Sequence, residues 1–397
     1  MSIMRGFFQG HNNMKPYAIS QILEQIARVI WIWGATFFIM KLGSGDYLQA
    51  VVQSTFGAFV GMIASIAVLL FALQKGGYIA RVLKKPESAI SIDLKALIVE
   101  TVKEAIPLIV IGSAIQLYQF VDQITFVNFM EAITNFTKQE LMVDYSYMIS
   151  NPSKITMVII GVAGSIGSVA IPMITESFVK KDIKGTSNLI TDNIRMLSIV
   201  IIPAIVGTFI LARPLYVVFY GASEAAAIGL FRANLLLISL QGLYTLFGVI
   251  IQGIFENRKG IIFFITGLVV KIILHFPFIY FFHAYGPLLS TAAGLFVSNA
   301  LIFRRVDKVV GINKTAVRKN IMGISILALM MGIAVFALEV GLSQVLPPVG
   351  RMASLIHLIL AGSVGVLIYA YLTLKTRQLD KLIGAKADAL RRKLRIS

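Results

Sequence analysis

The sequence contains no cysteine and only four histidines, and just 14% of its 397 residues are charged. The missing cysteines exclude disulfides, thiolate metal sites and cysteine nucleophiles. A soluble domain carries about 25% charged residues, so this chain has too few for an ordinary water-facing surface. Apolar residues make up 57% of the chain, and the mean hydropathy is +0.83. The composition therefore excludes an ordinary soluble enzyme and indicates a protein whose solvent is the lipid bilayer.

Long uncharged runs predict the membrane spans, because a helix needs about 20 mostly apolar residues to cross a bilayer. A turn signal at His283 to Pro287 divides the longest run into two spans. The short run 29–40 reaches spanning length because Arg28 and Lys41 can snorkel from its ends. We therefore expect an all-α, polytopic membrane protein with about ten spans, built around residues 29–40, 47–74, 105–121, 155–175, 196–212, 233–255, 260–282, 287–303, 320–338 and 352–374.

The net charge of +17 predicts the orientation of these spans. In a chain embedded in lipid, such an excess is a topology signal rather than the footprint of a nucleic-acid partner. With a cytoplasmic N-terminus, the cytoplasmic segments hold 28 Lys and Arg residues and the outer segments hold 6. This bias persists through all ten crossings and predicts a multi-pass protein of the cell membrane with both termini in the cytoplasm.

The last residues, 376–397, form a basic tail. Its apolar side chains repeat on one helical face, which predicts an amphipathic helix lying on the membrane and binding anionic lipids. The alternative is a tail in water, whose basic residues only reflect the general excess of Lys and Arg on the cytoplasmic side. The residues of that apolar face are Leu379, Leu382, Ile383, Leu390 and Leu394.

Lys271 lies in the middle of the seventh predicted span, and His275 follows one turn later on the same face. Ionisable groups at membrane depth are costly and are functional candidates for that reason. Two cationic side chains would suit an anionic group such as a phosphate, so both residues are candidate substrate contacts. The alternatives are a structural lysine paired with a buried carbonyl or carboxylate, and a histidine that only packs.

Polar side chains also mark the third predicted span. Gln116, Gln119 and Gln123 share one helical face and are expected to look into the protein or a wet cavity, as candidate substrate contacts. Asp122, at the end of this span, is a candidate site for coupling to an ion or a proton. The alternative for Asp122 is an interfacial cap near the outer surface.

The sixth predicted span carries a polar stripe of Asn234, Gln241, Gly248 and Gln252, which return to nearly the same helical angle. The stripe indicates either interhelical hydrogen bonds or the lining of a cavity. In the second case, Asn234, Gln241 and Gln252 are further candidate substrate contacts.

Small residues and a proline gather in the fourth predicted span, among them Gly164, Ser165, Ser168 and Pro172. Small side chains allow close helix packing and the proline allows a bend, so these residues indicate packing or a gating hinge. No catalytic constellation, phosphate-binding loop or metal-ligand spacing stands out. We therefore expect no enzyme activity, no cofactor and no metal.

Three strings resemble one family of membrane transporters. They are Arg5-Gly-Phe-Phe-Gln-Gly10 with Asn13-Met-Lys-Pro16 and Ser20-Gln-Ile-Leu-Glu-Gln25, then the segment from Gly167 to Ser177, and the loop Arg258-Lys-Gly260. These strings are similar to segments of polysaccharide and lipid-linked oligosaccharide flippases. That family includes the stage V sporulation protein B type and the MurJ-like lipid II flippases, within the multidrug/oligosaccharidyl-lipid/polysaccharide exporter superfamily.

The resemblance implies a two-lobe exporter fold. The start of this chain matches the point after the family's fourth span, so we expect a partial fold lacking the first four spans. Its expected parts are a remnant of the N-terminal lobe (1–80), a six-helix C-terminal lobe (96–303), a final helix pair (318–375) and the basic tail (376–397).

The resemblance also implies a function. We expect a flippase that moves a polyisoprenyl-pyrophosphate-linked glycan, such as lipid II or a polysaccharide unit, across the cytoplasmic membrane by alternating access. Cell-wall synthesis proteins are further expected partners. The alternatives are a drug/cation antiporter of the same superfamily, which would need intramembrane carboxylates that are scarce here, and a truncated family member that does not transport.

Overall fold

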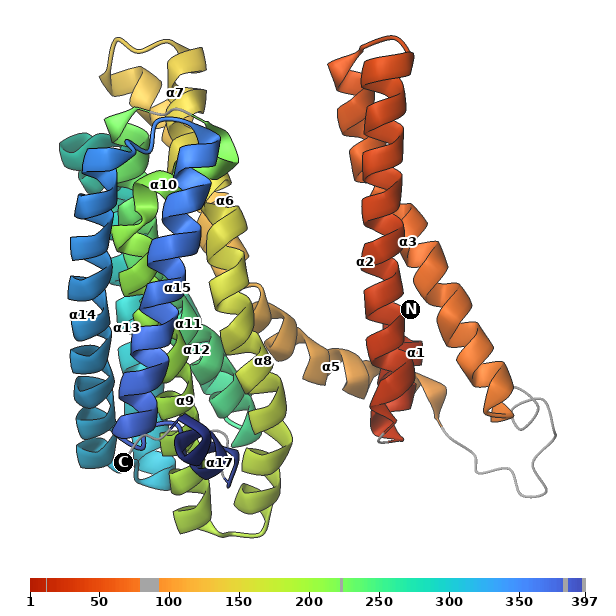
Figure 1. The fold of residues 1–397 in the computed structure, drawn as a ribbon. Coiled ribbons are helices and arrows are strands. Elements are labelled where there is room, and N and C mark those ends of the chain that lie inside the picture. The colour runs from red at the N-terminus through yellow and green to blue at the C-terminus, as the bar shows by residue number, and fades with distance from the viewer. Residues whose placement is uncertain (12, 79–92, 222–223, 381–384, 395–397) are drawn as a thin grey trace. The chain divides into compact units, whose positions relative to one another are not determined.

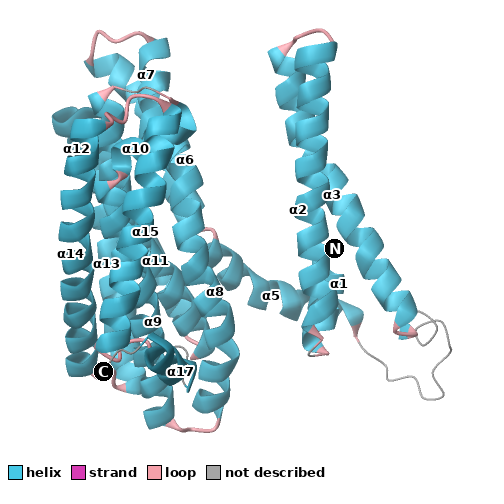
Figure 2. Cartoon of the chain, in the orientation of Figure 1, coloured by secondary structure: helices cyan, strands magenta, loops and turns pink. Residues whose placement is uncertain are grey.

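The computed structural model describes residues 1–11, 13–78, 93–221, 224–380 and 385–394 (Figure 1). The described residues contain helices and no strand, as Figure 2 shows, which confirms the predicted all-α class. They form two compact units, Met1–Asp93 and Leu94–Ser397, called unit 1 and unit 2 below. The predicted division of residues 96–375 into a six-helix lobe and a final pair stays a prediction.

Unit 1 is a helical hairpin preceded by a short helix. Its elements are α1 (Ser2–Gly10), α2 (Met14–Phe37), the π-helical turn η1 (Phe38–Leu42) and α3 (Tyr47–Lys75). Gly57 and Gly61 let α3 approach α2 closely: a Cβ added at Gly61 would lie 2.6 Å from the Glu24 carbonyl oxygen. Arg5 of α1 then joins both helices, because it donates to Glu24 Oε2 (2.7 Å) and to Ser65 Oγ (2.9 Å).

Unit 2 is a helical bundle built around α11, as Figure 1 shows. Among the described helices long enough to span a membrane, α11 is the most buried, because α8, α9 and α13 pack around it. The elements of unit 2 are α5 (Leu94–Gly112), α6 (Ala114–Ile133), α7 (Lys138–Tyr145), η2 (Ser146–Ser150), α8 (Asn151–Val179), α9 (Ile183–Ile210), α10 (Ala212–Tyr220), α11 (Ala225–Gly253), α12 (Asn257–Phe282), η3 (His283–Tyr285), α13 (Gly286–Val310), α14 (Lys314–Val345), α15 (Arg351–Lys375) and α17 (Ala385–Leu394).

Eight helical segments of the described chain are long and apolar enough to cross a membrane. One of them, Asn257–Val310, holds the two helices α12 and α13 joined at η3, as the turn signal at His283 predicts. The third predicted span is not among the eight. The chain there forms two helices, α5 and α6, which meet at Ser113 and point in different directions in Figure 1. The count of ten spans therefore stays a prediction.

The helix hairpin α14–α15 packs against α9 and α10. Its helices are joined by His357, a fully buried residue of α15. One ring nitrogen lies 2.8 Å from Glu339 Oε2 of α14, and the other lies 2.7 Å from the Leu346 carbonyl oxygen. These bonds fix the end of α14 against the start of α15.

The basic tail is tied to α15, because Arg391 of α17 donates to the Leu374 carbonyl oxygen (3.2 Å). Arg391 of α17 pairs with Asp380 (2.5 Å) and Asp388, and Arg195 of α9 donates to the Gln378 carbonyl oxygen (2.8 Å). The hydrogen bonds from Arg391 lower the pKa of the Asp380 carboxyl, so this pair stays ionised at neutral pH. Leu382 and Ile383 of the predicted apolar face lie outside the described residues, as do the side chains of Leu390 and Leu394.

A close helix crossing in unit 2 joins α12 and α13 at Gly267 and Gly294. A Cβ at Gly267 would lie 2.4 Å from the Gly294 carbonyl oxygen and 2.0 Å from Ser298 Oγ. No room for a side chain exists on either helix at this point, so the crossing sets how closely α12 and α13 approach.

We predict that Gly267→Ala lowers the thermal unfolding midpoint of the purified chain in detergent by several degrees. The added methyl group would clash with backbone that cannot rotate away, at a cost of about 1–3 kcal/mol. Gly341→Ala of α14 is the matched control, because a Cβ there meets nothing within 4 Å. Alanine favours a helix, so the control should keep or raise the midpoint. Equal midpoints for both variants would contradict the close crossing.

Candidate functional site

Helix α6 carries one buried face, and Asp122 is the acidic residue on it. The buried residues recur every four positions: Ala114, Tyr118, Asp122, Phe126 and Met130. This spacing puts all five side chains on one side of the helix. Asp122 is 3% exposed, so its carboxylate needs a partner inside the protein.

Helix α12 presents two basic residues to the same interior. Lys271 and His275 are four residues apart and are both 0% exposed, within a buried face that also includes Gly267 and Ile279. The sequence predicts that they share one helical face, and in the structure both lie on the buried face of α12.

Three oxygen atoms surround the Lys271 ammonium. Nζ lies 2.8 Å from Asp122 Oδ1, and it donates to the Tyr118 carbonyl oxygen (2.6 Å) and to Thr291 Oγ1 of α13 (2.7 Å). Two of the three ammonium donors therefore make hydrogen bonds, and the ion pair with Asp122 balances the charge. This arrangement joins α6, α12 and α13, and it neutralises the buried charge of both ionised partners.

His275 extends this cluster by one turn. Its Nε2 lies 2.7 Å from Thr125 Oγ1 of α6, and its Nδ1 lies 3.2 Å from Ser290 Oγ of α13. The same Nδ1 is 3.6 Å from Asp122 Oδ1. A neutral imidazole donates from one nitrogen and accepts at the other, and hydroxyl groups can serve both roles. We refer to Asp122, Lys271, His275 and their hydroxyl partners Thr125, Ser290 and Thr291 as the polar core.

A small cavity adjoins the polar core. Its volume is about 20 Å³, which is room for one water molecule. Four of the residues predicted from the sequence line it: Gln119, Asp122, Asn234 and Gln241. Asn234 is held in place because its Nδ2 donates to the Met148 carbonyl oxygen (2.9 Å). The polar stripe of α11 therefore both makes an interhelical hydrogen bond and lines a cavity.

The remaining predicted residues lie away from the polar core. Gln116 and Gln123 are exposed on α6, and Gln252 is half-buried near the end of α11. On α8, Ser165 and Ser168 are exposed and donate back to the Gly161 and Gly164 carbonyl oxygens of their own helix. A Cβ at Gly164 would meet nothing within 4 Å, and Pro172 is exposed.

The close contact of α8 with α11 is made instead by Gly167. A Cβ there would lie 2.7 Å from Val249 Cγ2 of α11. This glycine belongs to the same run of small residues as Gly164, but it is buried, whereas Gly164 is only half-buried.

Sequence reasoning missed the hydroxyl residues of the polar core. Thr125 lies four residues beyond Val121 on the α6 face next to Asp122, and Ser290 and Thr291 follow Pro287 in an otherwise apolar run. Two adjacent hydroxyl residues inside a predicted span are a signal that could have identified α13 as a partner of α12.

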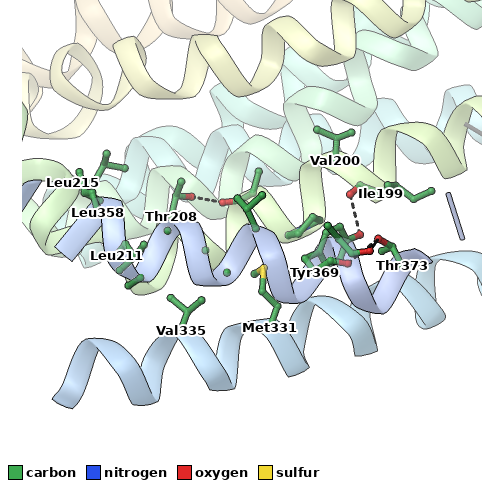
Figure 3. Close-up of a pocket in the computed structure, with 18 of the residues that line it drawn as sticks. Ile199, Val200, Thr208, Leu211, Leu215, Met331, Val335, Leu358, Tyr369 and Thr373 are labelled. Carbon is green, nitrogen blue, oxygen red and sulfur yellow. Dashed lines mark hydrogen bonds between the residues drawn. The ribbon is translucent and has the colours of Figure 1, made fainter. Parts of the chain in front are cut away.

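A second, apolar cavity lies between α9, α14 and α15, with a volume of about 540 Å³ (Figure 3). Its polar residues turn their hydroxyl groups onto backbone carbonyls: Thr208 bonds Ala204 (2.6 Å), Tyr369 bonds Ile199 (2.9 Å) and Thr373 bonds Tyr369 (2.7 Å). The surface of this cavity therefore consists mainly of apolar groups. Its residues include Pro203, Gly207, Met331, Val335, Leu358 and Gly362. We call it the apolar pocket.

The fold and the two sites define a helical membrane protein with several spans. Its unit 2 contains both the polar core, whose charges are paired, and the apolar pocket.

Comparisons with known proteins identify the family within this class. A family model described as polysaccharide biosynthesis protein matches residues 1–178. The lipid II flippase MurJ of Bacillus subtilis (strain 168) is 31% identical over 402 aligned positions, which cover 99% of this chain and 73% of that protein. The chain therefore belongs to the MurJ-like flippase family and is a multi-pass protein of the cell membrane.

Two further relatives agree with this assignment. The stage V sporulation protein B of the same organism is 33% identical over 73 residues, which cover 18% of this chain and 14% of that protein. A solved structure titled lipid II flippase MurJ, inward closed conformation, matches with a TM-score of 0.59 at 18% identity. That match covers 93% of this chain and 69% of the solved one, and it supports the fold.

We predict that breaking the buried ion pair from either side destabilises the chain more than removing it whole. Asp122→Asn or Lys271→Met alone leaves one buried charge without a partner, at a cost of about 3–5 kcal/mol. The double variant leaves neither charge, so its unfolding midpoint in detergent should exceed that of both single variants.

The control for this comparison is the ion pair between Lys314 and Asp307 (2.6 Å), in which Lys314 is 63% exposed. An exposed pair contributes about 0–1 kcal/mol, so Lys314→Met should change the midpoint little. If Asp122→Asn and Lys271→Met changed it no more than Lys314→Met does, the buried pair would not have the structural role assigned to it.

Proposed function

We propose that this chain is a flippase that moves a lipid-linked oligosaccharide, such as lipid II, across the cytoplasmic membrane for wall or polysaccharide synthesis. The observation that carries this proposal is the similarity of 99% of the chain to a lipid II flippase at 31% identity. The proposed role is transport rather than catalysis, and the proposed substrate is a glycan on a polyisoprenyl pyrophosphate.

The apolar pocket supports a substrate with a long hydrocarbon chain. The hydroxyl groups of Thr208, Tyr369 and Thr373 are already bonded to backbone carbonyls, so they offer few hydrogen bonds to water inside the pocket. A hydrocarbon chain can therefore fill the pocket without breaking a hydrogen bond. We propose that the pocket holds part of the polyisoprenyl tail while the headgroup is exposed to each side of the membrane in turn.

The exposed glutamines of α6 support contacts with a polar headgroup. Gln116 and Gln123 lie on the outside of unit 2, and Gln119 borders the small cavity. Exposed amide groups at membrane depth need a wet surface or a polar ligand. We therefore propose that these glutamines, with Asn234, Gln241 and Gln252 of α11, contact the sugar or phosphate groups of the substrate.

The polar core suits a coupling role better than direct contact with a phosphate. The Lys271 ammonium is 0% exposed and already holds three oxygen partners, so an anion could reach it only if α6, α12 and α13 separate. We propose that Asp122, Lys271 and His275 form a coupling group, in which a change of protonation or ion binding at Asp122 alters the packing of these three helices.

The membrane orientation and further partners are also proposals. The excess of Lys and Arg in alternate connecting segments supports a cytoplasmic location for both termini. The basic residues of the tail support contact with anionic lipids, and the family supports partners among the cell-wall synthesis proteins. The small residues Gly164, Ser165 and Ser168 and the proline Pro172 are proposed to give α8 a bend or a packing surface.

The direct test is transport by the purified full chain in proteoliposomes that contain fluorescently labelled lipid II. A membrane-impermeant quencher removes the signal of the outer leaflet, so flipping appears as a growing quenched fraction. We predict faster exchange than in protein-free liposomes, and exchange no faster than in those liposomes would contradict the proposal.

A pocket variant belongs to the same experiment. Gly362→Phe places a ring into the apolar pocket, where a Cβ at Gly362 meets nothing within 4 Å. It should slow exchange of the long-chain substrate several-fold and affect a short-chain analogue less. Gly341→Phe, on α14 outside the pocket, is the control and should leave the rate unchanged.

A further inference from the structure

A third cavity, of about 720 Å³, lies in unit 2 where α5 passes the start of α12. It is lined by Lys103 and Pro107 of α5 and by the five residues from Phe255 to Lys259. Neither the polar core nor the apolar pocket includes any of these residues. The loop 256–260 is one of the segments that the charge bias assigns to the cytoplasmic side.

Three basic side chains around this cavity have no protein partner. Lys103, Arg258 and Lys259 are exposed, and none of them has an ion pair or side-chain hydrogen bond within the described parts of the chain. The acidic residue of the lining, Glu256, is already neutralised, because Arg305 of α13 lies 2.5 Å from its Oε1. The cavity therefore carries a local excess of positive charge.

The start of α12 adds to this positive potential. Glu256 precedes the helix but makes no side-chain cap, so the first N–H groups of α12 lack a side-chain acceptor. Uncapped N–H groups and the helix dipole favour an anion at this position. The Asn257 Oδ1 atom, in a residue that lines the cavity, has no hydrogen-bond partner within the described residues.

The backbone at this edge is held in an uncommon conformation. Phe255 has a φ of 60°, in the left-handed region, and its ring is 62% exposed. A non-glycine residue in this region is costly, and such residues gather at binding sites. Phe255 and Pro107 place apolar groups directly beside the three cations, which fits a ligand with a charged head and an apolar body.

We propose that this cavity binds the phosphate group of a membrane lipid. A basic pocket between helix ends on the cytoplasmic side is suited to lipid headgroups, and the exposed ring of Phe255 can lie against the first carbons of the chains. Two lipids share this chemistry: an anionic phospholipid and a polyisoprenyl pyrophosphate. For an anionic phospholipid the site goes beyond the proposed transport function and does not depend on it, whereas for a polyisoprenyl pyrophosphate it rests on that function.

The test is lipid binding by the purified full chain in detergent, measured by native mass spectrometry. The probes are dioleoyl phosphatidylglycerol, undecaprenyl pyrophosphate and, as the lipid without net charge, dioleoyl phosphatidylcholine. We compare the natural chain with the triple variant Lys103→Gln, Arg258→Gln, Lys259→Gln. The matched control removes three exposed cations elsewhere on the predicted cytoplasmic side, Arg304→Gln, Lys308→Gln and Lys319→Gln.

We expect the site variant to bind at least one of the two anionic lipids roughly tenfold or more weakly, since each basic residue adds to the attraction. The control variant should change binding less than about twofold. Phosphatidylcholine should bind equally to the natural chain and to both variants. Loss for phosphatidylglycerol identifies an anionic phospholipid, and loss for undecaprenyl pyrophosphate alone identifies a polyisoprenyl lipid. If the triple variant does not fold, Arg258→Gln alone gives the comparison.

Equal binding by the natural chain and the site variant, or an equal loss in the control, would overturn the proposal. Because the measurement needs no transport, its failure is separate from a failure of the flippase function.

Discussion

The ion pair between Asp122 and Lys271 is the constraint around which unit 2 is arranged. Two charges buried at membrane depth are tolerated only when they are paired and their remaining donors are satisfied. The Tyr118 carbonyl and the Thr291 hydroxyl complete the set of partners for the ammonium. These atoms come from three helices, so α6, α12 and α13 must approach closely. The glycines at positions 267 and 294 make that approach possible.

Unit 2 keeps polar and apolar environments apart. In the polar core, hydroxyl and charged groups point at one another, and in the apolar pocket the hydroxyl groups of Thr208, Tyr369 and Thr373 point back at their own or adjacent backbone. A lipid-linked glycan also has one polar and one apolar part. The separation within unit 2 is what the proposed function requires of a protein that must move the first part and accommodate the second.

The sequence could predict what depends on local pattern and could not predict what depends on distant partners. Apolar runs predict the helices, and spacing places Lys271 and His275 together on a buried face, with pairing to a carboxylate left as one alternative. The carboxylate is Asp122, on α6, and only the tertiary structure reveals it. Likewise, the run of small residues on α8 predicts close packing, but the glycine that makes the close contact is Gly167 rather than Gly164. The break at Ser113 between α5 and α6 was not predicted, because Gly112 and Ser113 carry no strong turn signal.

The central claim is that the Lys271 ammonium is enclosed and neutralised inside unit 2. It is tested most directly by labelling the folded full chain in detergent with a small amine-acylating reagent and measuring each lysine by mass spectrometry. The account predicts that Lys271 reacts roughly a hundredfold more slowly than exposed Lys103, and equally fast after denaturation. Labelling of Lys271 at the rate of Lys103 in the folded chain would contradict it.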